Sequence, residues 1–214
     1  QISLAPLAFA GVAGFALVRF AEGPVGPFAP VLAVLVATAV GVVVGLPAVR
    51  VRGMALAIAT LAAAVAIEEL LFKWSWLTGG AAGVRAPKLS LLGVDMSISA
   101  VGAEFPRPIF GVVCVLVCGA AVVAVSALLR SRAGVVFLAV RGNEQAAAAA
   151  GVDVARVKLA AFAVSAALAG VGGVLLAYQR QSLSVQSYQV FLSLSIVALA
   201  YLAGITSIAG ALLA

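Results

Sequence analysis

The sequence contains no histidine, few acidic residues and only two cysteines. Without an imidazole the chain can form neither a Ser-His-Asp triad nor a His-ligated metal site, which excludes many hydrolase and zinc mechanisms. Cys114 and Cys118 are four residues apart in an apolar run, so we interpret them as packing residues on one helix face. The phosphate-binding pattern G-x-x-x-x-G-K-[ST] does not occur. We therefore expect no metal, no cofactor and no bound nucleotide in this chain.

Charge is also scarce. Only 9% of the 214 residues are charged and 65% are hydrophobic, with a mean hydropathy of +1.26, whereas a soluble domain has roughly 25% charged residues. The 13 Lys and Arg exceed the 7 Asp and Glu, but the basic residues are scattered between apolar runs and do not form one basic face. The composition indicates a protein that crosses a lipid bilayer several times and has no nucleic-acid partner.

We predict six membrane spans, because crossing roughly 30 Å of hydrocarbon takes about 20 mostly apolar residues. They cover residues 2–18, 29–49, 54–72, 109–129, 155–178 and 190–212. The runs are continuous and rich in Ala, Leu and Val, which favours helices over the alternating strands of a barrel. The expected fold is an all-α, polytopic transmembrane helix bundle that forms one domain over residues 1–214, truncated at both ends.

Basic residues mark one side of this bundle. Arg50 and Arg52 flank one turn, and the segment 130–158 contains five more basic residues. Alternation of the spans places both segments on the same side, which the positive-inside rule makes cytoplasmic. The long loop 73–108 then lies on the outer side, where it forms either a lid or docking surface or a solvated connector.

Cysteines introduced at Ser131 and Ser90 test this orientation. We expect a membrane-impermeant thiol reagent to label Ser90→Cys in intact cells, and Ser131→Cys only from the cytoplasmic side, because the two positions lie on opposite sides of the predicted bundle. Labelling of both positions from the same side would contradict the topology.

Glycines recur at helix-packing spacings. Gly41 and Gly45 form a GxxxG pattern, which lets two helix backbones approach closely. Gly170, Gly172 and Gly173 are interpreted in the same way, with a flexible, gate-like helix as the alternative.

Two carboxylates lie near the outer end of the third span. Lys73 can pair with Glu69 at i,i+4, and Trp74 and Trp76 are typical of the headgroup region. We therefore interpret Glu68 and Glu69 as interfacial residues, with proton coupling as the alternative.

The segment 141–153 predicts a short cytoplasmic helix. Asn143 is a favourable N-cap, Glu144 complements the positive helix N-terminus, and the alanines that follow favour helix. Gly151 suits the position after the helix, and Asp153 can cap the next span. Such a helix is a rigid element suited to transmitting motion from a cytoplasmic partner; a helix lying on the lipid surface is the alternative.

Three ordered blocks carry longer motifs. Residues 45–61 contain GLPAVRVRG and then LAIATL, residues 78–84 read TGGAAGV, and residues 141–170 contain RGNEQAAAAAGV and then KLAAFAVSAALAG. Together they resemble the membrane subunits of ATP-binding-cassette (ABC) importers for branched-chain amino acids. The chain departs from the family pattern at residues 203–207, where AGITS replaces Gly-Gly-x-Gly-Ser, and at Gly142.

The resemblance implies a permease subunit in the bacterial or archaeal plasma (inner) membrane, which is a transport subunit and not an enzyme. The expected partners are two ABC ATPase subunits, which would bind ATP and Mg²⁺, a homologous second permease subunit, and an extracytoplasmic solute-binding protein.

The resemblance also implies site residues. Residues 130–158 would be the cytoplasmic coupling loop, with ATPase-coupling positions at Arg141, Asn143, Glu144, Ala147 and Gly151. The binding protein would dock on outer loops that include residues 179–189 and the positions Thr78, Gly79, Gly80 and Gly83.

Polar residues within the spans are candidates for lining the pathway, although Ser and Thr in helices usually bond their own backbone. They are Thr60, Ser165, Ser193, Ser195 and Tyr201. Urea, short amides or sugars are alternative substrates within the resemblance. A self-contained secondary transporter or channel is the alternative from another class, but no acidic residue near the middle of a span and no inverted repeat supports it. A membrane enzyme has weaker support, since no reactive cluster is evident.

Overall fold

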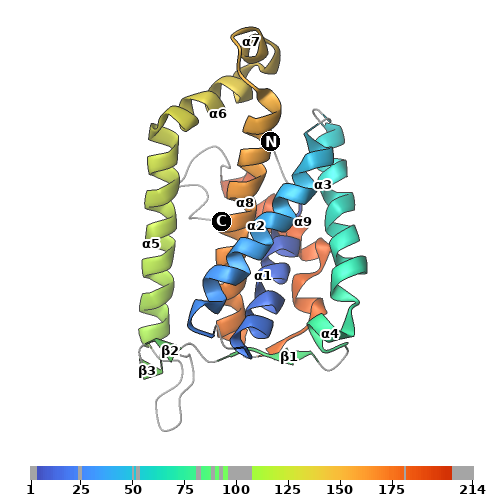
Figure 1. Cartoon of the computed structure of the whole chain (residues 1–214), viewed down its shortest axis with the longest axis vertical. Helices are drawn as coiled ribbons and strands as arrows, with labels where there is room; N and C mark the ends of the chain where they lie inside the picture. Colours follow the sequence, from blue (N-terminus) through green and yellow to red (C-terminus); the bar gives the residue numbers. More distant parts are fainter. Residues whose placement is uncertain are drawn as a thin grey trace.

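The computed structural model describes residues 4–23, 26–49, 51, 54–80, 83–87, 90–91, 94–95, 108–180 and 182–203. These residues form a bundle of helices (Figure 1). Five helical segments are long and apolar enough to cross a membrane, and α1 (Pro6–Ala21) is apolar but shorter. The prediction of an all-α, polytopic bundle is confirmed.

The helices that form these five segments follow the predicted spans closely. They are α2 (Ala29–Ala48), α3 (Met54–Ile67), α5 (Pro108–Arg130), α8 (Val154–Arg180) and α9 (Val190–Ala203). A π-helical turn, η2 (Glu68–Phe72), extends α3 to its predicted end. Residues 2–3 and 204–212 of the first and last predicted spans lie outside the described residues, as do Arg50 and Arg52.

Shorter elements connect these helices. They are the 3-10 helices η1 (Gly26–Phe28) and η4 (Val185–Tyr188), the helices α4 (Ser75–Thr78), α6 (Arg132–Gly142) and α7 (Glu144–Ala149), and the strands β1 (Val84–Arg85), β2 (Ser90–Leu91), β3 (Val94–Asp95) and β4 (Ser182–Leu183). β2 pairs with β3, and β1 pairs with β4, both antiparallel. α6 and α7 lie at one end of the bundle, and α4, β1 and β4 lie at the other (Figure 1).

α1 occupies the centre of the bundle. Every residue from Leu7 to Val18 is buried, because α2 and α8 pack along the helix and η4 and α9 make further contacts with it. Phe15 packs its ring against Phe72 and Tyr188, with centroid separations of 5.4 and 5.8 Å. The first span is therefore a core helix that the other helices enclose.

Side chains from two other helices satisfy the backbone where α1 begins. The Leu4 N–H donates to Thr60 Oγ1 at 3.1 Å, and the Leu7 N–H donates to Ser193 Oγ at 3.4 Å. The Ser193 hydroxyl in turn donates to the Leu4 carbonyl at 3.1 Å. Thr60 and Ser193 are completely or almost completely buried. Because polar backbone groups within a bilayer must find partners inside the protein, these bonds tie the start of α1 to α3 and α9.

The glycines bring the central helices into close contact. A Cβ atom on Gly41 of α2 would lie 2.2 Å from Ala166 Cβ of α8, and a Cβ on Gly173 of α8 would lie 2.1 Å from the Ala10 carbonyl oxygen of α1. Gly170 faces α2 in the same way, at 3.1 Å from Ala37 Cβ. The predicted packing role is confirmed for Gly41, Gly170 and Gly173, but a Cβ on Gly172 would meet no described residue within 4 Å, so the prediction was wrong for Gly172.

The end of α3 that is predicted to face outward carries the predicted ion pair. Lys73 Nζ binds the Glu69 carboxylate, and Trp74 and Trp76 are exposed. The neighbouring Glu68 has a different role, because its Oε2 accepts a hydrogen bond of 3.4 Å from the Val190 N–H at the start of α9. This contact links residues that are 122 positions apart in the sequence.

Beyond its first turns, where Phe110, Val113 and Cys114 contact the core, α5 lies apart from the central helices (Figure 1). Phe110 is buried, but no residue from Gly111 to Arg130 is. α6 then runs across the end of the bundle and leads into α7. α6 was not predicted, because its short apolar stretch lies between arginines and shows no periodicity that separates it from a loop.

Two neighbouring glycines of α8 provide a matched test of this packing. Gly173→Ala should lower the free energy of unfolding by about 1–3 kcal/mol, because its methyl group overlaps the α1 backbone. In Gly172→Ala the new methyl group meets no described residue within 4 Å, so this variant should keep or slightly raise stability through the higher helix propensity of alanine. Thermal denaturation in mild detergent measures both, and equal melting temperatures would contradict the close packing of α1 and α8.

Candidate functional site

The start of α7 is fixed by a side-chain cap. Asn143 Oδ1 accepts hydrogen bonds from the backbone N–H groups of Gln145 and Ala146, at 2.9 and 3.0 Å. The Asn143 backbone is extended, with φ −155° and ψ 110°, as expected for a residue that precedes a helix. The predicted N-cap is confirmed.

The end of α7 is equally well defined. Gly151 has a φ of +84°, and its N–H donates to the Ala148 carbonyl at 3.0 Å, while the Val152 N–H donates to the Ala147 carbonyl at 3.0 Å. This pair of bonds is a Schellman motif, for which glycine is the favoured residue. Asp153 then caps α8, since its Oδ1 accepts from the Arg156 N–H at 3.1 Å. Both predicted positions are confirmed.

An ion pair connects α7 to α8. Lys158 Nζ lies 2.8 Å from each oxygen of the Glu144 carboxylate. The Lys158 side chain is only 2% exposed and that of Glu144 is 26% exposed. Lys158 begins the KLAAF motif, but its contact with Glu144 was not predicted, because a separation of 14 residues across two caps gives no periodic pattern.

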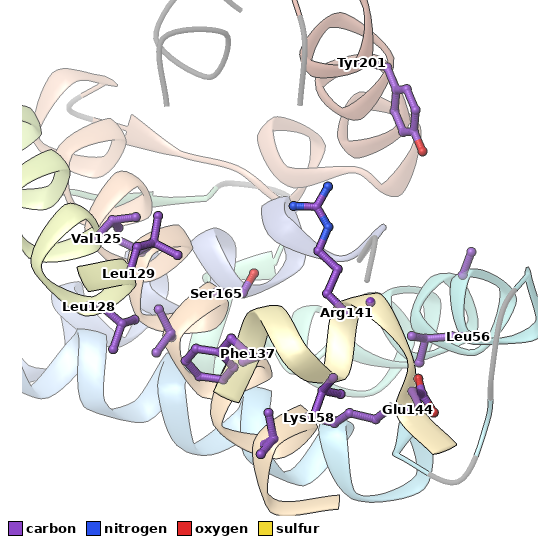
Figure 2. Close-up of a pocket in the computed structure, with 17 residues that line it drawn as sticks. Leu56, Val125, Leu128, Leu129, Phe137, Arg141, Glu144, Lys158, Ser165 and Tyr201 are labelled. Atoms are coloured by element: carbon purple, nitrogen blue, oxygen red, sulfur yellow. The ribbon is translucent and has the colours of Figure 1, made fainter. Parts of the chain in front are cut away.

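A cavity of about 1020 Å³ lies beside this ion pair. Its walls come from α3, α5, α6, α7, α8 and α9 and are mostly apolar, with Leu56, Ala57, Val125, Leu128, Leu129, Phe137, Val140, Val157, Ala161, Val164 and Leu168 among the lining residues. Ser165, Tyr201 and Arg141 also line it. Figure 2 shows Arg141 extending away from Glu144 and Lys158. The cavity thus brings together Arg141 and Glu144, predicted for coupling, and Ser165, predicted for the pathway.

The other predicted pathway residues form local or structural bonds. Thr60 also donates to its own helix, at the Ala57 carbonyl, and Ser195 donates to the Phe191 carbonyl at 3.3 Å. Ser193 bonds the start of α1. Their role in lining a pathway stays a prediction.

The predicted docking positions lie at the opposite end of the bundle. Thr78 is fully buried, and its hydroxyl lies within hydrogen-bond distance of the Phe72 and Trp74 carbonyls, at 3.1 and 3.2 Å. The glycines that follow need positive φ, with values of 71° at Gly79, 64° at Gly80 and 69° at Gly83. Side chains other than glycine are disfavoured in that region. The TGG segment is thus a defined turn, not a loose loop.

Two segments that are distant in sequence meet in this region. β1 follows the turn and pairs with β4, which follows α8, in the register Val84 with Leu183 and Arg85 with Ser182. Leu183 is fully buried. Residues 179–189 and the glycine turn are predicted to share one docking surface, and the structure places β1 and β4 next to each other.

The comparisons with known proteins identify the family. A family profile described as the permease component of branched-chain amino acid transport systems matches residues 1–214. The chain belongs to this family. The chain is 33% identical over 192 residues to the high-affinity branched-chain amino acid transport system permease protein LivM of Salmonella typhimurium strain LT2, and 32% identical to LivM of Escherichia coli strain K12. These relatives are named as permeases, which are transport proteins and not enzymes.

Each of these matches covers 82% of this chain but 45% of the relative, so the chain spans about half the length of the curated relatives it matches. No solved structure matches it. Membership of a permease family and the five apolar helices confirm the expected location as an integral protein of the plasma membrane.

Removing the cap of α7 tests this local structure. Asn143→Ala should cost the helix about 1 kcal/mol, because the N–H groups of Gln145 and Ala146 lose their acceptor. Hydrogen exchange measured by mass spectrometry should become faster across residues 144–149. Asn143→Ser, which retains an oxygen acceptor, should stay close to the natural protein; unchanged exchange in Asn143→Ala would contradict the capping role.

Proposed function

We propose that this chain is the membrane-spanning part of a permease subunit in an ATP-driven ABC importer for branched-chain amino acids. It would form the translocation pathway with a homologous second permease subunit. Two separate ATPase subunits would bind ATP and Mg²⁺ and hydrolyse the nucleotide. Family membership and the names of the LivM relatives support this proposal.

The observation that carries the proposal is α7. It is a short helix with both ends capped, held beyond the end of the spans by α6 and α8. Gln145, Ala146, Ala148 and Ala149 are exposed on it. A rigid, protruding helix with small side chains fits into a cleft of a partner protein, because few rotamers must be ordered when it docks. We propose the ATPase subunit as this partner, in agreement with the predicted coupling role of the segment.

The predicted coupling positions then divide into two groups. Gly151 and Arg141 are exposed, so they are available to a partner. Ala147 is buried, and Glu144 binds Lys158 within the chain. Asn143 forms the cap. The second group would act by shaping α7, and the exposed residues would contact the ATPase.

The opposite end would receive the solute-binding protein. β1, β4 and the glycine turn form a backbone-paired surface there, and Arg85, Trp74 and Trp76 are exposed in its vicinity. Branched-chain amino acids are the substrate class that we propose, on the basis of the relatives' names.

Purification of the full-length protein from its own host in mild detergent is the direct test. We expect two nucleotide-binding subunits and a second permease to be recovered with it, and ATP-dependent leucine uptake once the binding protein is added to vesicles. A solitary protein that moves solute without ATP would overturn the proposal in favour of a secondary transporter. Uptake of urea, amides or sugars in place of leucine would overturn only the substrate.

A bulky substitution tests α7 as the docking element. Ala148→Trp should weaken ATPase binding about tenfold or more, because overfilling a close contact costs about 1–3 kcal/mol. Ala160→Trp provides the control, since Ala160 is also an exposed alanine but lies on α8. The yield of co-purified ATPase measures both, and equal yields would contradict docking through α7.

A further inference from the structure

The Lys158–Glu144 pair joins α7 to α8, whereas the neighbouring Arg156–Asp153 pair lies within one short segment of the chain. Lys158 lies in the second turn of α8, and Glu144 is the first residue of α7. Figure 2 shows the two side chains side by side at one end of the apolar cavity. Since Lys158 is 2% exposed, its charge depends on this carboxylate for compensation.

α7 needs such a contact to keep a fixed direction. Its six residues are far too few for an independently stable helix. Two short connections, at Asn143 and at residues 150–153, join it to α6 and α8. The caps fix the ends of α7 but not its angle to α8. The ion pair constrains this angle, because Glu144 lies before the 150–153 connection and Lys158 lies after it.

α8 in turn runs the length of the bundle and contacts its central helices. Its 27 residues correspond to a length of about 40 Å. It packs closely on α1 and α2 through Gly173, Gly170 and Ala166. Its other end leads into β4, which pairs with β1. A displacement of the start of α8 therefore reaches both the central helix and the opposite end of the molecule.

We propose that Lys158 is a positioning residue that holds α7 at a fixed angle to α8 through Glu144, so that motion imposed on α7 moves α8 with it. This inference rests on the proposed function, in which a partner ATPase moves α7. It assigns Glu144 an internal role in place of a direct contact with that partner. Lys158 lies in the predicted coupling loop 130–158 but is not among its predicted coupling positions, and it becomes part of the coupling machinery.

The exposed ion pair between Arg156 and Asp153 offers a matched control. It lies in the same turns of the chain, but the side chains are 88% and 51% exposed and are three residues apart. Exposed pairs of this kind contribute little. Arg156→Met removes one positive charge two residues from Lys158 without touching the contact between α7 and α8.

The geometry is tested first on the full-length permease alone, in lipid nanodiscs. Spin labels at the exposed positions Ala149 and Ala160 report the distance between α7 and α8. In Lys158→Met the distance distribution should become about twofold broader, because a six-residue helix is marginal without tertiary support. Glu144→Gln, which is a milder change, should broaden it as well. Lys158→Arg and Arg156→Met should keep the narrow distribution.

An unchanged distribution in Lys158→Met or in Glu144→Gln would overturn the proposal. Broadening in Arg156→Met to the same extent would also overturn it, because a general loss of charge would then explain the effect. If Lys158→Met does not accumulate in the membrane, Glu144→Gln decides the geometry, with Lys158→Arg as the rescue.

Coupling is tested on the assembled complex in vesicles, without labels. In Lys158→Met the amount of leucine transported per ATP hydrolysed should fall about tenfold while ATP hydrolysis continues, a size typical of coupling between two sites. Lys158→Arg should restore the ratio, and Arg156→Met should leave it unchanged. A normal ratio despite a broadened distance distribution would overturn the coupling role of Lys158.

The two proposals would fail in different measurements. Failure of the proposed function would be visible in the natural sequence, which would then recover no ATPase and show no ATP-dependent uptake. Failure of the inference about Lys158 would be visible only in the variants, with the natural complex active. The distance measurement needs neither ATPase nor substrate.

Discussion

The close approach of α8 to α1 and α2 is the contact on which the rest of the structure depends. Hydrocarbon tails compete with apolar side chains on equal terms, so helices in a bilayer associate through van der Waals contact at short range and through polar bonds. Gly41, Gly170 and Gly173 permit this close approach of the helices. Any larger side chain at these positions would meet an atom of the neighbouring helix at or within van der Waals distance. Two hydroxyl groups, of Thr60 and Ser193, add the polar bonds at the start of α1. The bundle is thus organised around the close contact between these helix backbones.

In this arrangement α8 connects the two ends of the bundle. One end of it is capped by Asp153 and carries α7, and the other leads into β4, which pairs with β1. Between these ends the small residues of α8 allow little sliding, since interfaces packed at this density shift between discrete arrangements and do not deform continuously. α5 is the contrast, because no residue after Phe110 is buried in it. The two functional ends of the chain are therefore linked through the tightly packed helices and not through α5.

The sequence predicts the parts of this structure that local chemistry determines. Continuous apolar runs locate the spans, and Asn143, Gly151 and Asp153 locate the ends of helices because caps need particular side chains or a positive φ. Contacts between distant segments leave no such signal. The central burial of α1 could not be predicted, because a helix that is apolar on all sides looks the same in lipid as in protein. The pairing of β1 with β4 involves two residues from each strand, too few for an alternating pattern.

Glu144 shows most clearly which contacts cannot be predicted from neighbouring residues in the sequence. Its position at a helix N-terminus is sufficient reason for an acidic residue, so the sequence offers no cause to look for a further partner. The structure places the carboxylate against a buried lysine. Buried ion pairs contribute little net stability relative to apolar residues of the same size, because desolvation offsets the attraction. The caps at Asn143 and Gly151 already stabilise α7. The Lys158–Glu144 pair therefore contributes mainly to the orientation of α7. Its two charges must stay together beside an apolar cavity, and this holds α7 at one angle to α8.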